Sequence, residues 1–161
     1  MNNTAIFPGS FDPITNGHIN LIKRACNLYT NVIVGVAKDT SLKKTFFSYE
    51  ERLKFVAESL KNFSGVTVKG FSGLLVDFYQ AEGACSIIRG LRSTTDFGYE
   101  KQLFNVNKLL LPGVEMIFLM ATKEEVYISA SMVRELALLG KDISAFVPGA
   151  VVRAFKLTYG K

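Results

Sequence analysis

The stretch Phe7-Pro-Gly-Ser-Phe-Asp-Pro-Ile-Thr-Asn-Gly-His18 joins a short apolar run to an amphipathic helical pattern, and it contains the only histidine of the chain. Residues 3–7 predict a buried strand, and apolar residues at helical spacing follow the stretch. Open α/β sheets bind ligands at strand-to-helix crossings of this kind. Gly9 and Gly17 leave room for a phosphate beside backbone N–H groups, and Ser10 offers a hydroxyl. The stretch therefore predicts a phosphate-binding loop.

Apolar, β-branched runs alternate with helical patterns along the rest of the chain. The runs are 5–7, 32–36, 66–68, 86–88 and 116–119, and the helical patterns are about 18–29, 48–61, 73–82, 96–111, 131–139 and 149–158. Ser48 and Glu51 form a capping box at the start of the second pattern. Near-continuous apolar strands that alternate with helices predict a parallel sheet covered on both faces. We therefore expect an α/β fold with a doubly wound five-stranded parallel sheet, formed by 1–161 as a single domain with a helical C-terminal tail at about 141–161.

Composition favours a protein with an ordinary core and an anionic small-molecule ligand. The hydrophobic fraction of 48% and the charged fraction of 20% are near globular averages. The net charge of +5 calls for an anionic partner, but the basic residues are scattered instead of forming one strip. We therefore expect a small phosphorylated ligand and no nucleic acid.

The sequence shows no sign of membrane insertion or of a protein-bound metal. No apolar window approaches about 18 residues and no leader pattern opens the chain, so we expect a cytoplasmic protein with no membrane contact. Cys26 and Cys85 lack C-x-x-C spacing, and no second histidine accompanies His18. We expect both cysteines to be reduced and buried, and we expect no metal site made of protein side chains.

Polar residues follow each predicted strand. In chain order they are Ser10 and His18, Lys43 and Lys44, 73–75, Arg89 and Arg92, and 123–131. The carboxyl ends of parallel strands share one edge of a sheet, so these segments are expected to meet there. Arg89 and Arg92, on either side of a glycine turn, suit bidentate contacts to phosphate oxygens.

Each of these features can also be explained by a purely structural role. The arginines suit a solvated loop paired with surface carboxylates, and Lys43 with Lys44 suits a solvated charge pair. The segment 129–131 is foremost a helix N-cap, and His18 alone is more typical of a helix start than of a catalyst. No catalytic triad can be assembled, and neither the P-loop nor the dinucleotide glycine motif is present.

Taken together, these motifs resemble those of the bacterial phosphopantetheine adenylyltransferases, members of the nucleotidyltransferase superfamily marked by a [TH]-x-G-H motif, here Thr15-Asn-Gly-His18. The matching motifs are the opening stretch, Lys43-Lys44 before Glu50-Glu51-Arg52, Ile88-Arg-Gly-Leu-Arg92, Asp96-Phe-Gly-Tyr-Glu100 and Ile128-Ser-Ala-Ser131. The resemblance covers essentially the whole chain. It implies a Rossmann-like nucleotidyltransferase fold and adenylyl transfer from ATP to 4′-phosphopantetheine, the penultimate step of coenzyme A synthesis.

The resemblance also implies roles for individual residues. His18 is the expected catalytic residue, a transition-state stabiliser. The expected substrate-binding residues are Ser10, Lys43, Leu75 and Arg89. The expected ATP-binding residues are Ser10, Phe11, His18, Arg89, Gly90, Leu91, Arg92, Glu100, Glu125, Val126, Tyr127, Ile128, Ser129, Ala130 and Ser131. Magnesium (Mg2+) is expected to bridge phosphates, the assembly to be a homohexamer, and coenzyme A to be a feedback ligand.

Two positions depart from the family pattern, and two rival functions stay open. The family commonly has Thr at the position of Ser10 and Ser at the position of Ala130, so a methyl and a hydroxyl are lost. One rival is a related nucleotidyltransferase with nicotinamide mononucleotide or glycerol 3-phosphate as acceptor. The other is a non-catalytic nucleotide-binding module, which predicts binding without turnover.

Overall fold

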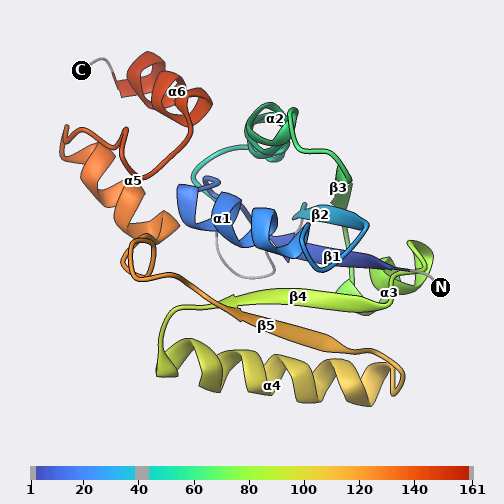
Figure 1. The fold of residues 1–161 in the computed structure, drawn as a ribbon. Coiled ribbons are helices and arrows are strands. Elements are labelled where there is room, and N and C mark those ends of the chain that lie inside the picture. Colours follow the sequence, from blue (N-terminus) through green and yellow to red (C-terminus); the bar gives the residue numbers. More distant parts are fainter. Residues whose placement is uncertain (1–2, 39–43, 160–161) are drawn as a thin grey trace.

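The computed structural model describes residues 3–38 and 44–159, in which strands and helices alternate (Figure 1). The elements are β1 (Thr4–Gly9), α1 (Asn16–Ala25), β2 (Asn31–Ala37), α2 (Tyr49–Leu60), β3 (Val66–Phe71), α3 (Leu75–Ala81), β4 (Ser86–Leu91), α4 (Thr94–Leu110), β5 (Met116–Met120), α5 (Ala130–Leu138) and α6 (Gly149–Tyr159). Every predicted strand and helix is present. The boundary of a C-terminal tail near 141 stays a prediction.

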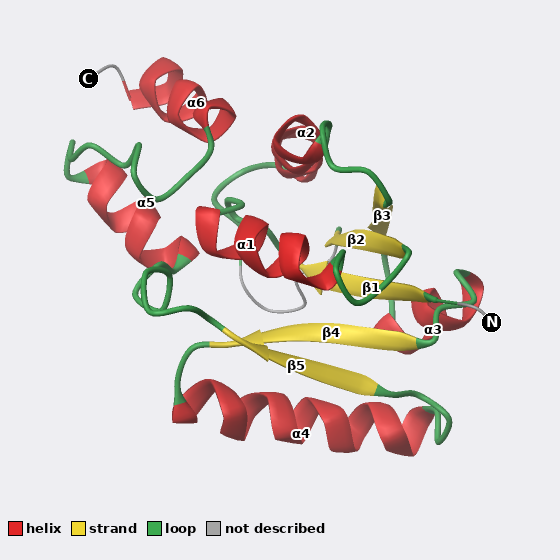
Figure 2. Ribbon diagram, in the orientation of Figure 1, coloured by secondary structure: helices red, strands yellow, loops and turns green. Residues whose placement is uncertain are grey.

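The strands form one parallel sheet of five strands in the order β3-β2-β1-β4-β5 (Figure 2). The chain moves outward from β1 to β3, then crosses back over β1 to β4. The order therefore reverses between β1 and β4, which is where such sheets bind ligands. The predicted doubly wound sheet is confirmed.

Alternate residues of each central strand enter two separate cores. Ala5 and Phe7 of β1 join the core formed with α1, α2, α5 and α6. Ile6 between them joins the core on the other face, which α3 and α4 cover (Figure 1). Apolar residues on both faces explain why the strands are near-continuous apolar runs.

The sheet opens at the carboxyl ends of β1 and β4. The two strands pair only at Ala5 with Ser86 and at Ile6 with Ile87, whereas β1 stays paired with β2 as far as Gly9. Beyond Ile6, the Arg89 side chain of β4 reaches β1 through a hydrogen bond to the Pro8 carbonyl. This separation is the structural origin of the cleft described below.

β4 extends to Leu91, three residues further than the apolar run predicts. Arg89 and Gly90 therefore lie in the strand, so the expectation of a loop with a glycine turn is wrong at this point. A Cβ on Gly90 would lie 2.4 Å from Cδ1 of Leu21. The glycine is needed for close packing of α1 on the sheet, not for a turn.

The helix starts follow the capping signals in the sequence. Ser48 and Glu51 form the predicted capping box of α2, and the Ser129 hydroxyl accepts the Met132 N–H at the start of α5. The helix α1 begins earlier than its apolar pattern predicts, because Thr15 caps it. Side chains at N-caps thus fix the residue at which each of these helices begins.

The structure bears on two further expectations, those for the cysteines and for the membrane. Cys85 is exposed and Cys26 partly exposed, so the expected burial of both is wrong; the Cys85 thiol donates to the Thr4 carbonyl at 3.2 Å. Among the helices of the described ranges, none has the length and apolar character needed to cross a bilayer.

Candidate active site

A cleft of about 410 Å³ lies at the carboxyl edge of the sheet, where β1 and β4 separate. Its walls are the β1–α1 loop, the end of β4, the start of α4 and the segment that leads into α5. A cleft of this volume suits a small-molecule ligand. The lining residues that the sequence analysis selected are Ser10, Phe11, His18, Arg89, Gly90, Arg92, Glu100, Glu125, Ile128, Ser129, Ala130 and Ser131.

His18 is fixed in one orientation by the capping box of α1. The Thr15 N–H donates to His18 Nδ1 at 3.1 Å, and the His18 N–H donates to Thr15 Oγ1 at 3.3 Å. A backbone N–H can only donate, so Nδ1 is the acceptor and the neutral ring carries its proton on Nε2. His18 therefore presents an Nε2–H donor while its other nitrogen is held by Thr15.

His18 is also held neutral by its surroundings. Burial, with smaller contributions from the positive charges of Arg92 and Arg89, lowers its pKa from 6.5 to about 4. The ring packs edge-on against Phe11, with 5.2 Å between ring centroids. At neutral pH this histidine is a hydrogen-bond donor without charge, and the two arginines supply the positive charge of the cleft.

The loop before α1 has an unusual backbone at Phe11. Its φ is 48°, a left-handed conformation that is rare for a bulky residue, although its side chain is 2% exposed. A Cβ on Gly9 would lie 3.0 Å from the Phe11 ring, so the glycine leaves space for that ring. Such conformations persist only when neighbouring contacts fix them.

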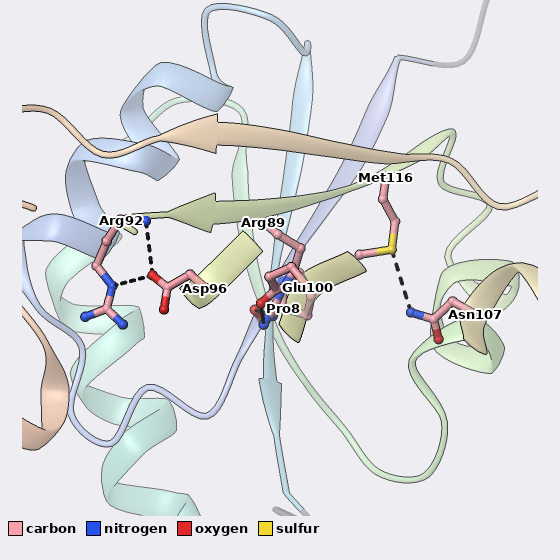
Figure 3. A network of polar contacts seen from close by, with 7 residues as sticks. All are labelled: Pro8, Arg89, Arg92, Asp96, Glu100, Asn107 and Met116. Carbon is pink, nitrogen blue, oxygen red and sulfur yellow. Dashed lines mark hydrogen bonds and ion pairs between the residues drawn. The ribbon is translucent and has the colours of Figure 1, made fainter. Parts of the chain in front are cut away.

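Arg89 projects from β4 toward β1 and is fixed by two groups (Figure 3). Its Nε and Nη2 donate to the two carboxylate oxygens of Glu100 at 2.9 and 2.6 Å, and its Nη1 donates to the Pro8 carbonyl at 2.9 Å. The bidentate geometry holds the guanidinium plane in place. Arg89 thereby spans the gap that the lost β1–β4 ladder leaves.

Arg92 follows β4 directly and is held more loosely (Figure 3). Its Nε donates to Asp96 at 3.2 Å, its backbone N–H donates to the same oxygen at 3.0 Å, and its Nη1 lies 3.4 Å from the Ile128 carbonyl. Asp96 belongs to the first turn of α4, whose cap is Ser93. Arg92 therefore links the start of α4 to the segment before α5.

The N-terminus of α5 forms the wall of the cleft opposite β4. Ser129 caps the Met132 N–H at 3.1 Å, and the Ser131 hydroxyl accepts from Arg134 Nη2 at 3.3 Å. Arg134 also donates to the carbonyl of Asp12 in the β1–α1 loop. The helix end is thus tied to that loop, and its N–H groups and positive dipole end favour an anion in the cleft.

The structure does not bring all the selected residues to the cleft. Leu75 packs on the opposite face with the core of α3 and α4, and Leu91 is buried. Val126 is absent from the lining, and Tyr127 points to solvent with 79% of its surface exposed. Lys43 lies outside the described residues. The roles expected of these residues stay predictions.

Glu100 lines the cleft and holds Arg89 in place. Its side chain is 7% exposed and both oxygens accept hydrogen bonds from Arg89. We therefore assign Glu100 the positioning of Arg89, and its expected contact with ATP stays a prediction.

Two residues that shape the cleft, Thr15 and Asp12, were not selected by the sequence analysis. Thr15 was quoted within its motif but not selected. Its position three residues before His18 is the spacing of a capping box, which can be recognised in a sequence. Asp12 accepts from the N–H groups of Phe46 and Phe47 at 2.8 and 2.9 Å. No local pattern reports a contact between residues so far apart in sequence.

The carboxylates around the cleft do not form a metal cage. Asp12 and Glu100 have both oxygens bonded, Asp96 accepts from Arg92, and Glu125 accepts from Thr122. Within 3–38 and 44–159, no group of three or more acidic, cysteine or histidine side chains is placed to hold a metal ion. The expectation that phosphates hold the magnesium ion stays a prediction.

Three comparisons with known proteins agree with this geometry. Residues 6–136 match the profile of the family described as cytidylyltransferase-like. The chain is 48% identical over 156 residues to the phosphopantetheine adenylyltransferase of Moorella thermoacetica, with 97% of each chain covered. It is 47% identical over 156 residues to the protein of the same name from Alkalilimnicola ehrlichii, with 96% of this chain and 90% of that one covered.

Solved structures share the fold at much lower identity. A Vibrio parahaemolyticus protein assigned as a nicotinate-nucleotide adenylyltransferase has a TM-score of 0.71 at 18% identity, covering 98% of this chain and 93% of that one. A bifunctional NMN adenylyltransferase/ADP ribose pyrophosphatase from Francisella tularensis, solved with AMP and a manganese ion, has a TM-score of 0.63 at 16% identity, covering 91% of this chain and 44% of that one. These likenesses concern the fold alone.

Proposed function

The chain belongs to the phosphopantetheine adenylyltransferase family of the cytidylyltransferase-like proteins, and we propose that it transfers an adenylyl group from ATP to 4′-phosphopantetheine. The products are dephospho-coenzyme A and pyrophosphate. The observation that carries the proposal is the His18 Nε2–H donor, neutral and immobilised, in a cleft with two arginines and a helix N-terminus.

The reaction needs no general base from the protein. An oxygen of the acceptor's phosphate forms a bond to the α-phosphorus of ATP, and the bond from that phosphorus to the oxygen of the β-phosphate breaks. The electron pair leaves with pyrophosphate, and no proton has to move. Because the nucleophile is already anionic, the absence of a catalytic triad fits the chemistry.

His18 and the two arginines divide the work of stabilising charge. In this proposal the His18 Nε2–H donates to an α-phosphate oxygen, whose negative charge grows in the crowded transition state. Ser10 and Arg89, with Lys43, hold the acceptor's phosphate. Arg89 is suited to this role because Glu100 and Pro8 occupy three of its five N–H groups and leave two for a ligand.

ATP is assigned to the side of the cleft bounded by Arg92 and α5. The β- and γ-phosphates would lie at the α5 N-terminus, near Ser129 and Ser131, where spare N–H groups and the helix dipole favour anions. Ala130 supplies only its backbone there. The link from Arg92 to the Ile128 carbonyl keeps this wall next to β4.

The expected magnesium ion fits this arrangement when the phosphates hold it. Among residues 3–38 and 44–159, no set of acidic, cysteine or histidine side chains is placed to hold a metal ion, so the proposal leaves the ion to the phosphates. When bound to the phosphates of ATP, a divalent cation offsets negative charge on the leaving pyrophosphate. Arg92 and the α5 N-terminus act on the same charge from the protein side.

The remaining expectations about partners and location also enter as proposals. A homohexamer is supported by apolar side chains left exposed on α4, among them Val106, Leu109 and Leu110. Coenzyme A as a feedback ligand is supported by the family resemblance, since it contains the acceptor's pantetheine unit. A cytoplasmic location is supported by the family's metabolic role.

The deciding experiment measures pyrophosphate release with ATP and magnesium. The acceptors are 4′-phosphopantetheine, nicotinamide mononucleotide and glycerol 3-phosphate in parallel, with CTP also tested as donor for the last. Release with 4′-phosphopantetheine alone would establish donor, acceptor and reaction. Release with another acceptor only would replace the proposed substrate. Nucleotide binding without release would identify a non-catalytic module.

His18→Ala tests the role of the donor in the same assay. We expect kcat to fall by roughly 10²-fold or more with little change in ATP binding, because the hydrogen bond acts mainly in the transition state. An Asn20→Ala variant, on the same helix outside the cleft lining, is the matched control. An unchanged kcat for His18→Ala would refute the assignment.

A further inference from the structure

Arg52 is a buried arginine in α2 for which the reaction outlined above gives no role. The residue is 1% exposed, although arginine is among the residues least often buried. It does not line the cleft and lies on the α2 side of the sheet. A buried guanidinium in this position therefore calls for an explanation.

The Arg52 side chain joins the carboxyl ends of two neighbouring strands. Its Nη1 donates to the Ser10 carbonyl at 2.5 Å and to the Ala37 carbonyl at 2.9 Å, and its Nη2 donates to the Lys38 carbonyl at 3.4 Å. Ser10 directly follows β1, and Ala37 is the last residue of β2. The planar fork fixes the start of the β1–α1 loop relative to the end of β2.

Stability alone does not account for this arginine. Within the described ranges its Nε is buried and has no acceptor. Burial lowers the pKa of the guanidinium, and the charge of Asp12 acts in the opposite direction. Replacing a buried ion by an apolar side chain of similar volume is often neutral or stabilising. A buried arginine with an unpaired N–H is therefore better explained by a functional need to hold its carbonyl partners in fixed positions than by stability.

The partner that matters is the peptide between Ser10 and Phe11. In a trans peptide the C=O and N–H point in opposite directions, so holding the Ser10 carbonyl on Arg52 turns the Phe11 N–H away from α2. Phe11 has the strained φ of 48°, which neighbouring contacts must maintain. The Ser10 side chain is exposed, and both residues line the cleft.

The geometry points to Arg52 as a positioning residue for phosphate binding: through the Ser10 carbonyl it fixes the peptide that carries the Ser10 hydroxyl, assigned to the acceptor's phosphate, and the Phe11 N–H, assigned to ATP. The inference rests on the proposed function, because it takes the bound phosphates to be those of the two substrates. It adds a remote arginine to the groups that position these phosphates. Arg52 itself does not touch the ligand.

Arg52→Lys is the main test, because lysine keeps the charge but cannot reproduce the fork. We expect kcat to fall on the order of 30-fold, because a misplaced Ser10–Phe11 peptide disturbs the alignment of the two reacting phosphates. The KM for ATP should change less than about threefold, because Arg92 and the α5 N-terminus are assigned to the rest of its triphosphate. Val56→Ala is the matched control: Val56 lies one turn further along α2, is fully buried and does not line the cleft. It should lower the melting temperature and leave kcat within about twofold.

A double-mutant cycle separates positioning from a general structural role. If Arg52 acts through Ser10, the kcat losses of Arg52→Lys and Ser10→Ala should be clearly less than multiplicative when combined. Fully multiplicative losses, or a kcat for Arg52→Lys within twofold of wild type, would overturn the proposal. The cycle compares kcat values of folded variants only. Its result therefore does not depend on how much each substitution lowers the stability.

A measurement on the wild-type protein covers the case in which Arg52 variants do not fold. Titration with inorganic phosphate should shift the amide resonance of Phe11 strongly and that of buried Val34 little. No response at Phe11 would overturn the proposal. A response at Phe11 together with no turnover of any acceptor would show instead that the proposed function fails while the phosphate-binding peptide stands.

Discussion

Two arginine–carboxylate pairs line the same cleft, and they differ in how firmly each arginine is held. In the Arg89–Glu100 pair the side chains are 24% and 7% exposed, and the carboxylate is bidentate. In the Arg92–Asp96 pair they are 40% and 28% exposed, and one carboxylate oxygen takes both contacts. Arg89 of the first pair lies within β4 at the edge of the sheet, whereas Arg92 and Asp96 of the second pair lie at the start of α4.

The difference follows from where β4 ends. Arg89 is still in the strand, so its side chain projects across the sheet edge onto α4, where Glu100 is buried. Arg92 follows the strand and remains near the surface. The inner arginine is therefore held in one orientation, and the outer arginine is freer to move. In the proposed function this suits a fixed phosphate at Arg89 and a flexible triphosphate at Arg92.

The largest effect that would test this contrast is expected from Glu100→Gln. Arg89 would lose its carboxylate while remaining mostly buried, so we expect a loss on the order of 2–3 kcal/mol in the free energy of unfolding. The KM for 4′-phosphopantetheine should rise, because Arg89 is no longer held in one orientation. Urea unfolding and steady-state kinetics measure the two effects.

Asp96→Asn is the matched control for that variant. Its pair is more exposed, so its stability should change by less than about 1 kcal/mol. Equal losses for the two variants would contradict the distinction between an inner, fixed pair and an outer, adjustable one.

The next effect in size is expected from Arg92→Ala. Loss of this cation should raise the KM for ATP about tenfold, because a charge-assisted contact to phosphate disappears, while stability changes by less than about 1 kcal/mol. Steady-state kinetics with each substrate varied in turn would measure it. A selective rise in the KM for 4′-phosphopantetheine would show that the two arginines were assigned to the wrong substrates.

The smallest effect concerns His18, the only histidine of the chain, so its ring resonances can be assigned without ambiguity. Its pKa is lowered from 6.5 to about 4 by burial first and by Arg92 and Arg89 next. Nitrogen-15 NMR should therefore show the Nε2–H form at pH 7 and protonation only near pH 4. In Arg92→Ala the pKa should rise but stay below 6.5, because burial remains.

The same pKa fixes the sign of a stability change. Between pH 6.5 and about 4 the unfolded chain binds a proton at His18 that the folded chain does not. Lowering the pH through this window therefore favours unfolding. A His18 that titrates near 6.5 in the folded protein would contradict both the burial and the influence of the arginines.

Much of the fold was readable from local patterns. The apolar runs gave the strands, Ser48 with Glu51 marked the start of α2, and Ser129 marked that of α5. The polar segments that follow the strands correctly predicted that Ser10, His18, Arg89 and most of the residues expected to bind ATP lie at one edge of the sheet. Each of these signals depends on neighbours in sequence, on N-caps or on the common direction of parallel strands.

Local patterns were least informative where a side chain finds its partner far along the chain or on another face. Glu100, expected to bind ATP, pairs with Arg89 of β4. Leu75, expected beside the substrate, packs in the core of the α3 and α4 face, and its role stays a prediction. Arg52 was quoted only as part of a motif, since its bonds to carbonyls of Ser10 and Ala37 join segments that local patterns do not relate.

The sequence by itself determined the alternating strands and helices, the helix caps and the set of polar residues gathered at the carboxyl edge. Those features depend on apolar periodicity and on contacts within a few residues. Only the tertiary structure decided how the polar groups are held: the tautomer and neutrality of His18, the Arg89–Glu100 pair and the hydrogen bonds of Arg52. These depend on burial and on hydrogen bonds between distant segments, which exist only once the sheet is assembled.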